Sequence, residues 1–200
     1  MCTDPFYCEE LLMDDMHAGG PAALPDSFRS GIGSFLEALL PPEPIQGAHL
    51  RFLDREKLEQ LMLERPPFFF IEKAVAVDGK TVWARARMDE ARSAGHFPGR
   101  PIVPLIELCK AMAQTGIILA GLQGDESKAP IAIGSGPSEA LAKDLIDAPV
   151  TVLIKVQLMR QKFGRFFSID GTAYVDGVPV GALPEIRYVL MDREQLLRKP

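Results

Sequence analysis

The sequence predicts an α+β domain in which an antiparallel sheet wraps around one long, apolar helix. Residues 104–120 are apolar on nearly every side, which indicates a helix buried at the centre of the domain. Residues 150–161 alternate apolar and polar side chains, the pattern of a half-buried strand. Asp-Gly pairs at 78–79 and 176–177 separate strand-like runs, and this dipeptide is a strong signal for a β-hairpin turn.

The composition bounds the class of protein. A chain of 200 residues, 47% apolar and 24% charged, has room for one domain with a large core and an appendage. The net charge of −5 and the lack of a Lys/Arg run argue against nucleic acid or an anionic membrane as a partner. Cys2, Cys8 and Cys109 form neither an even disulfide framework nor a metal-ligand pair. We therefore expect a cytoplasmic protein without a metal or cofactor, and the N-terminus shows no signal-peptide pattern.

We divide the chain into residues 1–49, a helical extension with a Pro-rich linker, residues 50–191, the main domain, and residues 192–200, a tail. Within the extension, residues 26–40 show apolar side chains at helical spacing. We expect this helix to pack on the main domain. Its apolar stripe consists of Phe28, Ile32, Phe35, Leu36 and Leu39.

The remaining elements follow from similar signals. A helix over residues 53–63 can be capped by Asp54. Residues 138–146 are predicted to be helical, and Pro184 predicts a bulge or an edge position in the last strand. Gly121 is well placed to end the central helix in a left-handed conformation. The predicted strands are 68–77, 81–88, 131–133, 150–161, 166–175 and 178–190.

Three polar residues interrupt the central helix. At about 100° per residue, Glu107, Lys110 and Gln114 fall within roughly 60° of one another and form one polar stripe. One interpretation is an internal Glu–Lys ion pair at a subunit interface. The other is that the stripe lines a cleft and acts together with the preceding loop, residues 95–101. Spacing alone does not decide between them.

A resemblance to a known family bears on this choice. His96 to Pro104, reading HFPGRPIVP, is followed by AMAQ at residues 111–114. The combination resembles the signature of the 3-hydroxyacyl-acyl-carrier-protein dehydratases, which have the hotdog fold, and the likeness covers about residues 50–190. It implies a homodimer that acts on acyl thioesters of an acyl carrier protein or coenzyme A, in fatty-acid or polyketide-type metabolism.

The resemblance also implies site residues. The loop histidine of the family corresponds to His96, and it acts with a carboxylate fourteen positions later on the partner subunit's central helix. That position is Lys110 in this chain. A main-chain N–H at the helix start, usually on glycine, polarises the thioester carbonyl in the family, and here it belongs to Leu105. The positions implied to contact substrate are Phe97, Gly99, Leu105 and Gln114.

Dehydration of a 3-hydroxyacyl thioester needs a base for the C2 proton, donors for the enolate-like oxygen and an acid for the leaving hydroxyl. His96 can be the base. Lysine, with an ordinary pKa of about 10.4, is a poor acid for the hydroxyl. Glu107 carries a carboxyl on the same stripe, but helix geometry displaces it by about 4.5 Å from position 110. If Glu107 and Lys110 pair, neither is available for chemistry.

The residues leave two classes of function open. The first is a dehydratase-like carbon–oxygen lyase, or a related hotdog thioesterase in which Glu107 would activate water. The second is a non-catalytic acyl-thioester-binding or structural protein that keeps the fold and has lost the acid. The intact loop at His96 supports the first class, and Lys110 supports the second. We favour a dehydratase-family protein and leave its activity to experiment.

Overall fold

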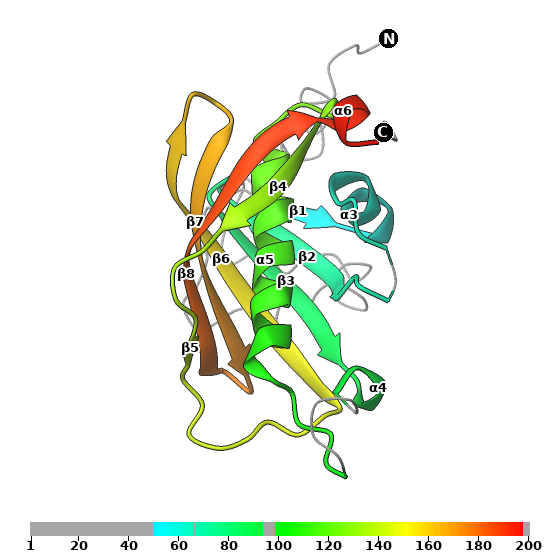
Figure 1. Ribbon diagram of the computed structural model, residues 1–200, viewed down its shortest axis with the longest axis vertical. Helices are drawn as coiled ribbons and strands as arrows, with labels where there is room; N and C mark the ends of the chain where they lie inside the picture. The colour runs from blue at the N-terminus through cyan, green and yellow to red at the C-terminus, as the bar shows by residue number, and fades with distance from the viewer. Residues whose placement is uncertain (1–49, 66, 94–98, 198–200) are drawn as a thin grey trace, which may run out of the picture. The chain divides into compact units, whose positions relative to one another are not determined.

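A computed structural model describes residues 50–65, 67–93 and 99–197 (Figure 1). Its strands form one antiparallel sheet in the order β1-β2-β3-β6-β7-β8-β4, and the short β5 pairs with β8. The strands are β1 (Leu50–Leu53), β2 (Ile71–Val77), β3 (Thr81–Met88), β4 (Lys128–Gly134), β5 (Glu139–Ala140), β6 (Val150–Lys162), β7 (Phe166–Val175) and β8 (Val178–Asp192). The helices are α3 (Arg55–Leu61), α4 (Glu90–Ser93), α5 (Leu105–Leu122) and α6 (Arg193–Leu197).

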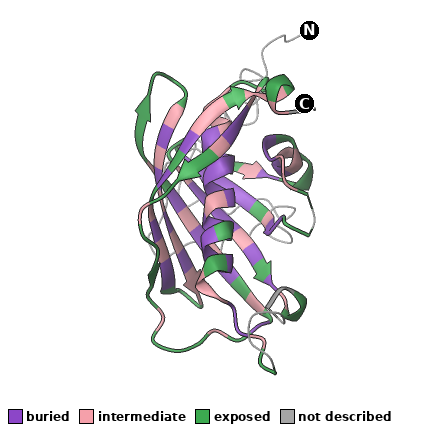
Figure 2. Cartoon of the chain, viewed as in Figure 1, coloured by how far each residue is buried: buried purple, intermediate pink, exposed green. Residues whose placement is uncertain are grey.

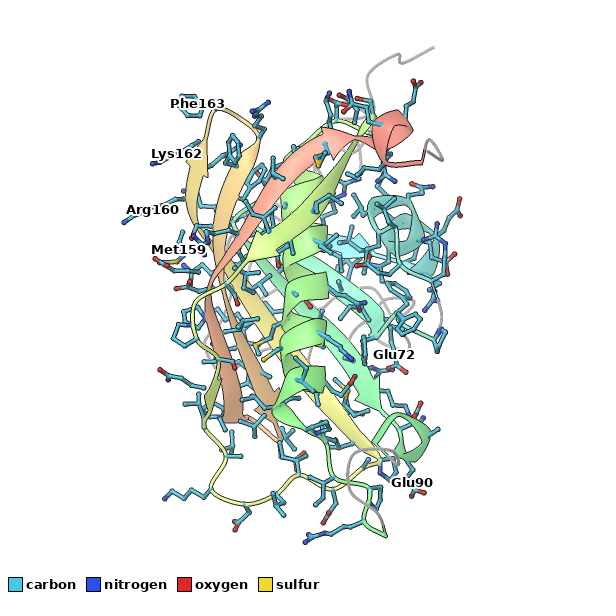
Figure 3. The ribbon with its side chains drawn as sticks, viewed as in Figure 1. Glu72, Glu90, Met159, Arg160, Lys162 and Phe163 are labelled. Atoms are coloured by element: carbon cyan, nitrogen blue, oxygen red, sulfur yellow. The ribbon has the colours of Figure 1, made fainter. Side chains whose placement is uncertain are left out.

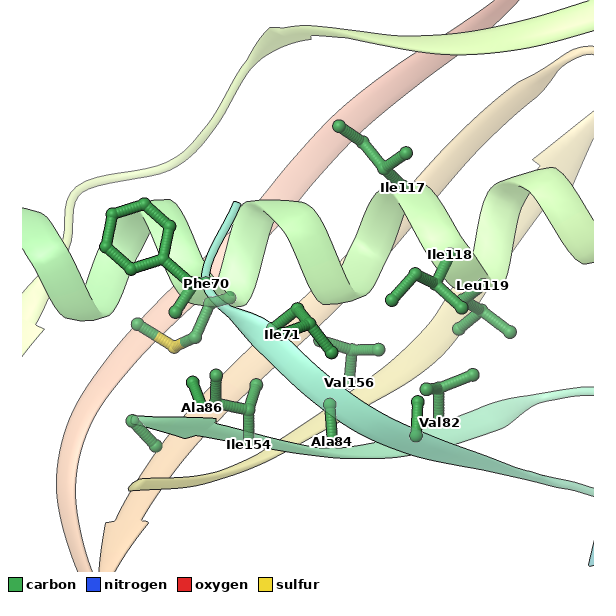
Figure 4. Close-up of a cluster of buried hydrophobic side chains, with 14 of the residues drawn as sticks. Phe70, Ile71, Val82, Ala84, Ala86, Ile117, Ile118, Leu119, Ile154 and Val156 are labelled. Atoms are coloured by element: carbon green, nitrogen blue, oxygen red, sulfur yellow. The ribbon is translucent and has the colours of Figure 1, made fainter. Parts of the chain in front are cut away.

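The predicted central helix is α5, and the sheet curves around it (Figure 1). In the core, Ile118 and Leu119 of α5 lie over inward-facing strand residues such as Val82 (Figure 4). Buried residues accordingly run along α5 and the strands beneath it, whereas the turns are exposed (Figure 2). By length and a mean hydropathy of 1.4 this helix could also cross a bilayer, but 67% of it is buried inside the domain, as in a core helix.

Local chemistry places several elements where they were predicted. Asp54 caps α3, because its Oδ1 accepts a hydrogen bond of 2.9 Å from the N–H of Lys57. The β2–β3 turn has φ values of +50° at Asp78 and +63° at Gly79. Two consecutive positive φ values are what a two-residue type I′ hairpin turn requires. The Asp-Gly prediction is therefore confirmed.

The middle of the core contains a close contact between α5 and β8. Tyr188 of β8 is fully buried, and its hydroxyl donates a 2.8 Å hydrogen bond to the carbonyl of Ala113. Gly116 makes room for it, because a Cβ at this position would lie 2.2 Å from the Tyr188 hydroxyl oxygen. Burial, with a smaller contribution from the nearby Glu64 carboxylate, raises the pKa of Tyr188 well above its ordinary value.

The prediction of a helix over residues 138–146 is wrong. The segment contains only the short strand β5 and then runs as irregular chain to β6. The N–H groups of Leu141 and Ala142 both donate to the carbonyl of Val180 on β8, at 3.0 and 3.2 Å. These main-chain groups find partners across the sheet edge rather than within a helical turn, so tertiary hydrogen bonding overrides the local helix propensity.

Gly121 does not end the central helix, which contradicts the prediction. The helix continues through Leu122, and its C-cap is Gln123 in a right-handed conformation with φ −89°. Gly121 serves a close approach instead, because a Cβ there would lie 3.1 Å from Cδ2 of Leu61 in α3. Gly121 therefore allows α5 and α3 to pack closely and is not the helix cap.

The bulge predicted at Pro184 is confirmed. The pairing of β7 with β8 shifts register between Ile169 and Gly171, where β8 passes through Pro184. Glu185 has a φ of +50°, and its N–H donates a 2.8 Å hydrogen bond to the carboxylate of Asp170. Because β8 lies between β7 and β4, the alternative of an edge strand is excluded.

The predicted extension, residues 1–49 with its helix over 26–40, lies outside the described residues. The boundary placed after residue 49 and the one placed after residue 191 remain predictions. Strand β1 was not predicted. Its last residue, Leu53, was assigned to the start of the following helix.

Candidate active site at the start of the central helix

The loop after residue 98 leads directly into α5. Gly99 adopts a left-handed φ of +80° in an exposed turn, a conformation that suits glycine. Pro104 is the N-cap residue of α5, in extended conformation. The side chain of Leu105 packs into the core beside Gly181 of β8, where a Cβ would be 3.4 Å from Leu105 Cδ1. Leu105 thus packs against Gly181 and part of the core.

Glu107 and Lys110 form an ion pair on the first turns of α5. Nζ of Lys110 lies 2.8 Å from Oε1 of Glu107, and both groups project from one side of the helix. Only 7% of the Glu107 side chain is exposed, compared with 48% of the Lys110 side chain. The carboxylate is therefore buried and the ammonium covers it from the solvent side. The structure contains the pairing that the sequence offered as one interpretation of the stripe.

Gln114 binds the chain that leads into β2. Its Oε1 accepts a 2.9 Å hydrogen bond from the N–H of Phe70, and its Nε2 donates to the carbonyl of Phe68. The Gln114 side chain is buried, so its amide finds its hydrogen-bond partners in the main chain. Gln114 therefore joins the central helix to the start of the sheet, and its amide is used by the fold.

Arg100 is held by a partner that sequence reasoning did not identify. Its Nε lies 2.9 Å from Oδ1 of Asp147, and its Nη2 lies 3.0 Å from Oδ2. This is the two-pronged geometry in which a guanidinium and a carboxylate match best. The hydrogen bonds raise the pKa of Arg100 and lower the pKa of Asp147 relative to their ordinary values. Both side chains are about half exposed.

Main-chain bonds join the same two segments. The N–H of Val103 donates to the carbonyl of Ile146 at 2.8 Å, and the N–H of Ala148 donates to the carbonyl of Pro101 at 2.7 Å. Ile102 forms an isolated antiparallel bridge with Asp147. The loop before α5 is thus fixed along residues 146–148, which pass beside the start of α5 (Figure 1).

Two of the predicted site residues, His96 and Phe97, lie outside the described residues. Glu107 and Lys110 are in contact with each other. The Leu105 side chain packs on the core, and the Gln114 side chain binds the main chain before β2. Asp147 was missed because it is 47 positions from Arg100. In the part of the chain that the structure describes, no three His, Cys, Asp or Glu side chains gather in the way that a metal site requires.

A second polar region lies on the sheet, far along the chain from the helix start. Arg160, Ser168 and Arg187 are direct cross-strand neighbours on β6, β7 and β8, and with Lys162 they line a hollow of about 290 Å³. We call Arg160, Lys162 and Arg187 the basic face. Next to it, Phe163 forms the tip of the β6–β7 hairpin and projects outward, 89% exposed (Figure 3).

Comparison with known proteins bears out the family resemblance. No family model matches the chain. The chain is 30% identical over 148 residues to the 3-hydroxyacyl-[acyl-carrier-protein] dehydratase FabZ of Anaeromyxobacter dehalogenans strain 2CP-1, an alignment that covers 72% of this chain and 94% of that protein. It is 29% identical over 150 residues to the FabZ protein of Anaeromyxobacter sp. strain Fw109-5, covering 72% and 93%.

Solved structures agree at the level of the fold. The dehydratase heterocomplex ApeI:P from Xenorhabdus doucetiae matches with a TM-score of 0.57 at 16% identity, covering 74% of this chain and 100% of that one. The dehydratase domain of RzxB from Pseudomonas fluorescens matches with a TM-score of 0.52 at 18% identity, covering 70% and 49%. The sequence relatives and the shared architecture together show that this chain belongs to the 3-hydroxyacyl-[acyl-carrier-protein] dehydratase family and has the hotdog fold.

Proposed function

We propose that this chain binds 3-hydroxyacyl thioesters as a dehydratase-type protein and that it turns them over weakly or not at all. Family membership supports the substrate class, because the relatives are named for dehydration of acyl-carrier-protein thioesters. The observation that carries the second half is the ion pair between Glu107 and Lys110. By the family resemblance, the acid corresponds to position 110, where this chain has the lysine of the pair.

The chemistry follows from what each group can supply. His96 removes the C2 proton of the substrate as a neutral imidazole. Main-chain N–H groups at the very start of a helix have no carbonyl one turn earlier to bind, so those of Leu105 and Ile106 can donate to the enolate-like oxygen. The N–H of Glu107 already donates to the carbonyl of Pro104 at 3.0 Å. The Leu105 side chain packs beside Gly181 of β8, on the core. Departure of the 3-hydroxyl as water then requires a proton from an acid.

That last step is the weak one in this chain. Lys110 is an alkylammonium paired to Glu107, and it gives up a proton less readily than a carboxylic acid. The Glu107 carboxylate is buried beneath it and displaced along the helix, and a displacement of a few ångström disables proton transfer. The pair therefore favours binding of the substrate over its dehydration.

The direct test is the substitution Lys110→Glu. It places a carboxyl at the family's position, and general acid catalysis is commonly worth about 10²- to 10⁴-fold in rate. We expect wild type to dehydrate a 3-hydroxyacyl thioester slowly and Lys110→Glu to do so measurably faster. The matched control is Lys110→Gln, which removes the ammonium without supplying an acid, and Lys110→Glu combined with His96→Ala should be inactive.

Robust wild-type turnover that collapses in Lys110→Glu would contradict the proposal, because Lys110 would then be a working acid. If both proteins are inactive, the binding half is tested separately by the change in melting temperature with a non-reactive acyl-pantetheine. A raised melting temperature would keep the chain as an acyl-thioester binder, and an unchanged one would exclude it.

The proposal includes a homodimer. Ile106 on α5 is 53% exposed and Phe68 is 67% exposed, both beside the polar stripe, and apolar surface of this kind favours a partner. Strand β4 also ends the sheet with an edge that another strand could pair. In the family the histidine of one subunit faces the helix of the other, so a dimer would complete the site. A single-chain mass by light scattering at micromolar concentration would refute it.

The proposed partner is an acyl carrier protein in the cytoplasm. Relatives are named for carrier-linked substrates, and the phosphodiester that joins an acyl arm to its carrier is an anion that Arg160, Lys162 and Arg187 could attract. Assaying Lys110→Glu with the same acyl group on a carrier protein and on pantetheine measures this preference. A free buried thiol, Cys109, suits the reducing compartment.

The thioesterase alternative is less well supported. It requires a carboxylate that activates water, and the candidate near the signature is Glu107. That carboxylate is nearly fully buried and bound to Lys110 at 2.8 Å. Water activation needs a carboxylate that reaches both water and substrate, so this arrangement does not favour it.

A further inference from the structure

The basic face lies on the outer surface of the sheet, opposite the central helix. Arg160, Ser168 and Arg187 form one cross-strand row on β6, β7 and β8. Side chains alternate between the two faces of a strand, and the next residues, Phe167 and Tyr188, are buried on the face that packs on α5. Ser168 and Arg187 therefore point away from α5.

The three cations of the basic face form no ion pair with any Asp or Glu among the described residues. Lys162 lies two positions after Arg160 on β6 and projects to the same side, so like charges gather here (Figure 3). At the other end of the β4–β8 pairing, Lys128 faces and binds Asp192. Arg187, on the same two strands, faces a glycine. Like charges without a counter-charge repel one another, and an anion bound among them removes that cost.

This glycine, Gly134 of β4, leaves space for the guanidinium of Arg187. A Cβ at Gly134 would lie 3.3 Å from Nη2 of Arg187, closer than an ordinary contact. The guanidinium therefore lies against the main chain of β4 and forms one wall of the hollow. A long side chain that already packs against the protein loses less conformational freedom when it binds a ligand.

The hollow has the size and the charge for a ligand that carries a phosphate group. Its volume of about 290 Å³ is several times the ~30 Å³ that one water molecule occupies in the liquid. One carboxylate reaches the lining, that of Glu185 at the bulge of β8, so three cations and one anion leave a net charge of +2. A phosphate monoester carries a charge of about −1.5 to −2 at pH 7, whereas a phosphodiester carries a single charge.

We propose that this hollow binds the terminal phosphate monoester of a small molecule, with Arg160, Lys162 and Arg187 as cationic donors and Ser168 as a hydroxyl donor. A guanidinium suits the task, because its planar fork donates two parallel hydrogen bonds to a phosphate. Ser168 stands between the two arginines in the cross-strand row. The inference goes beyond the proposed function, because the hollow uses no catalytic residue and prefers a monoester to the phosphodiester of a carrier.

Coenzyme A and dephospho-coenzyme A are matched probes for this site. They differ by one phosphate monoester and share the diphosphate and the pantetheine arm, so binding of the arm at the candidate active site contributes equally to both. We expect calorimetric titration at neutral pH and low salt to show coenzyme A binding about 10-fold tighter or more. Inorganic phosphate should compete with coenzyme A, and less well below about pH 6, where a phosphate loses its second charge.

Substitutions assign the preference to the hollow. Arg187→Gln should lower the ratio of the two affinities about 10-fold or to one, and Arg187→Lys should lower it less, since lysine keeps the charge and loses the fork. The matched control is Arg165→Gln. Arg165 is exposed on the same hairpin, where its guanidinium lies over the Phe166 ring, 4.9 Å from the centroid, and it does not line the hollow. This control removes the same charge and should leave the ratio at its wild-type value.

Equal binding of the two coenzymes would overturn the proposal. An equal loss in Arg165→Gln and Arg187→Gln would also overturn it, because general attraction of charge would then explain the binding. So would binding of a holo acyl carrier protein through Arg187 without any binding of coenzyme A, since the surface would then dock a protein. Melting temperatures check that the variants are folded, and Arg187→Lys decides if Arg187→Gln is not.

The result is separate from that of the proposed function. If acyl-pantetheine raises the melting temperature of wild type and Arg187→Gln alike while the two coenzymes bind equally, the proposed function stands and the phosphate site is wrong. If acyl-pantetheine has no effect but coenzyme A binds more tightly than dephospho-coenzyme A in an Arg187-dependent way, the phosphate site stands alone.

Discussion

The two halves of α5 differ in what surrounds them. Residues 115–120 are all buried against the sheet and α3, and their side chains are almost entirely apolar. The first half contains Glu107 and Lys110 and leaves Ile106 more than half exposed. The second half is thus completed by its own domain. The first half is not, and in this fold unfinished surface coincides with the place where chemistry is expected.

The largest expected effect is in the buried half. Gly116→Ala would place a Cβ 2.2 Å from the Tyr188 hydroxyl, a distance that no real contact tolerates. Overpacking of a core commonly costs about 1–3 kcal/mol and sometimes more, and here the buried hydroxyl must also leave its partner. We expect a loss of about 3 kcal/mol or more in urea unfolding. An equal loss of unfolding free energy in Ile106→Ala, in the first half of α5, would contradict the difference between the two halves.

The next effect belongs to the junction of the halves. Gln114→Leu removes the hydrogen bond from the Phe70 N–H, which is buried, and the bond to the Phe68 carbonyl. Loss of a buried hydrogen bond to a main-chain group commonly costs about 1–3 kcal/mol. Gln123→Leu is the matched control, because Gln123 donates a 2.7 Å bond to the carbonyl of Gly79 in an exposed setting. Equal losses in the two variants, measured by urea unfolding, would mean that burial does not set the cost.

The smallest effect is pH-dependent. Tyr188→Phe loses one buried hydrogen bond, worth about 0.5–1.5 kcal/mol at pH 7. Because burial raises the pKa of Tyr188 in the folded state, its stabilising contribution is present below the ordinary value of about 10 and is lost as pH rises above it. We therefore expect the wild-type free energy of unfolding to fall more steeply than that of Tyr188→Phe above about pH 10. Parallel curves would contradict the assignment.

Elements defined by local signals were predicted well from the sequence. Strand β3 occupies the predicted residues 81–88, and β7 the predicted residues 166–175. Both border an Asp-Gly turn. Such a turn needs a positive φ at two adjacent residues, and Asp followed by Gly is a pair that can adopt it, so the turn is recognisable from the sequence. The segment 138–146 failed because its helix-forming residues bind Val180, and that bond is set by distant residues.

The candidate site divides in the same way. The spacing of Glu107 and Lys110 offered their contact as one of two interpretations, because residues three apart on a helix are neighbours, and the structure contains that contact. The partner of Arg100 could not be read from its surroundings, since Asp147 reaches it only when the chain has folded back.

The β6–β7 hairpin has a property that matters for protein engineering. Its turn, Phe163-Gly164, has φ values of +53° and +65°, like the other hairpin turns, yet it carries phenylalanine where the others carry aspartate. A left-handed conformation costs an ordinary residue about 1–2 kcal/mol, and Asn or Asp less. A library screened for heat resistance should therefore replace Phe163 early. The same library screened with carrier-linked substrate would keep it if the tip takes part in docking, so the two screens would select different residues at one position.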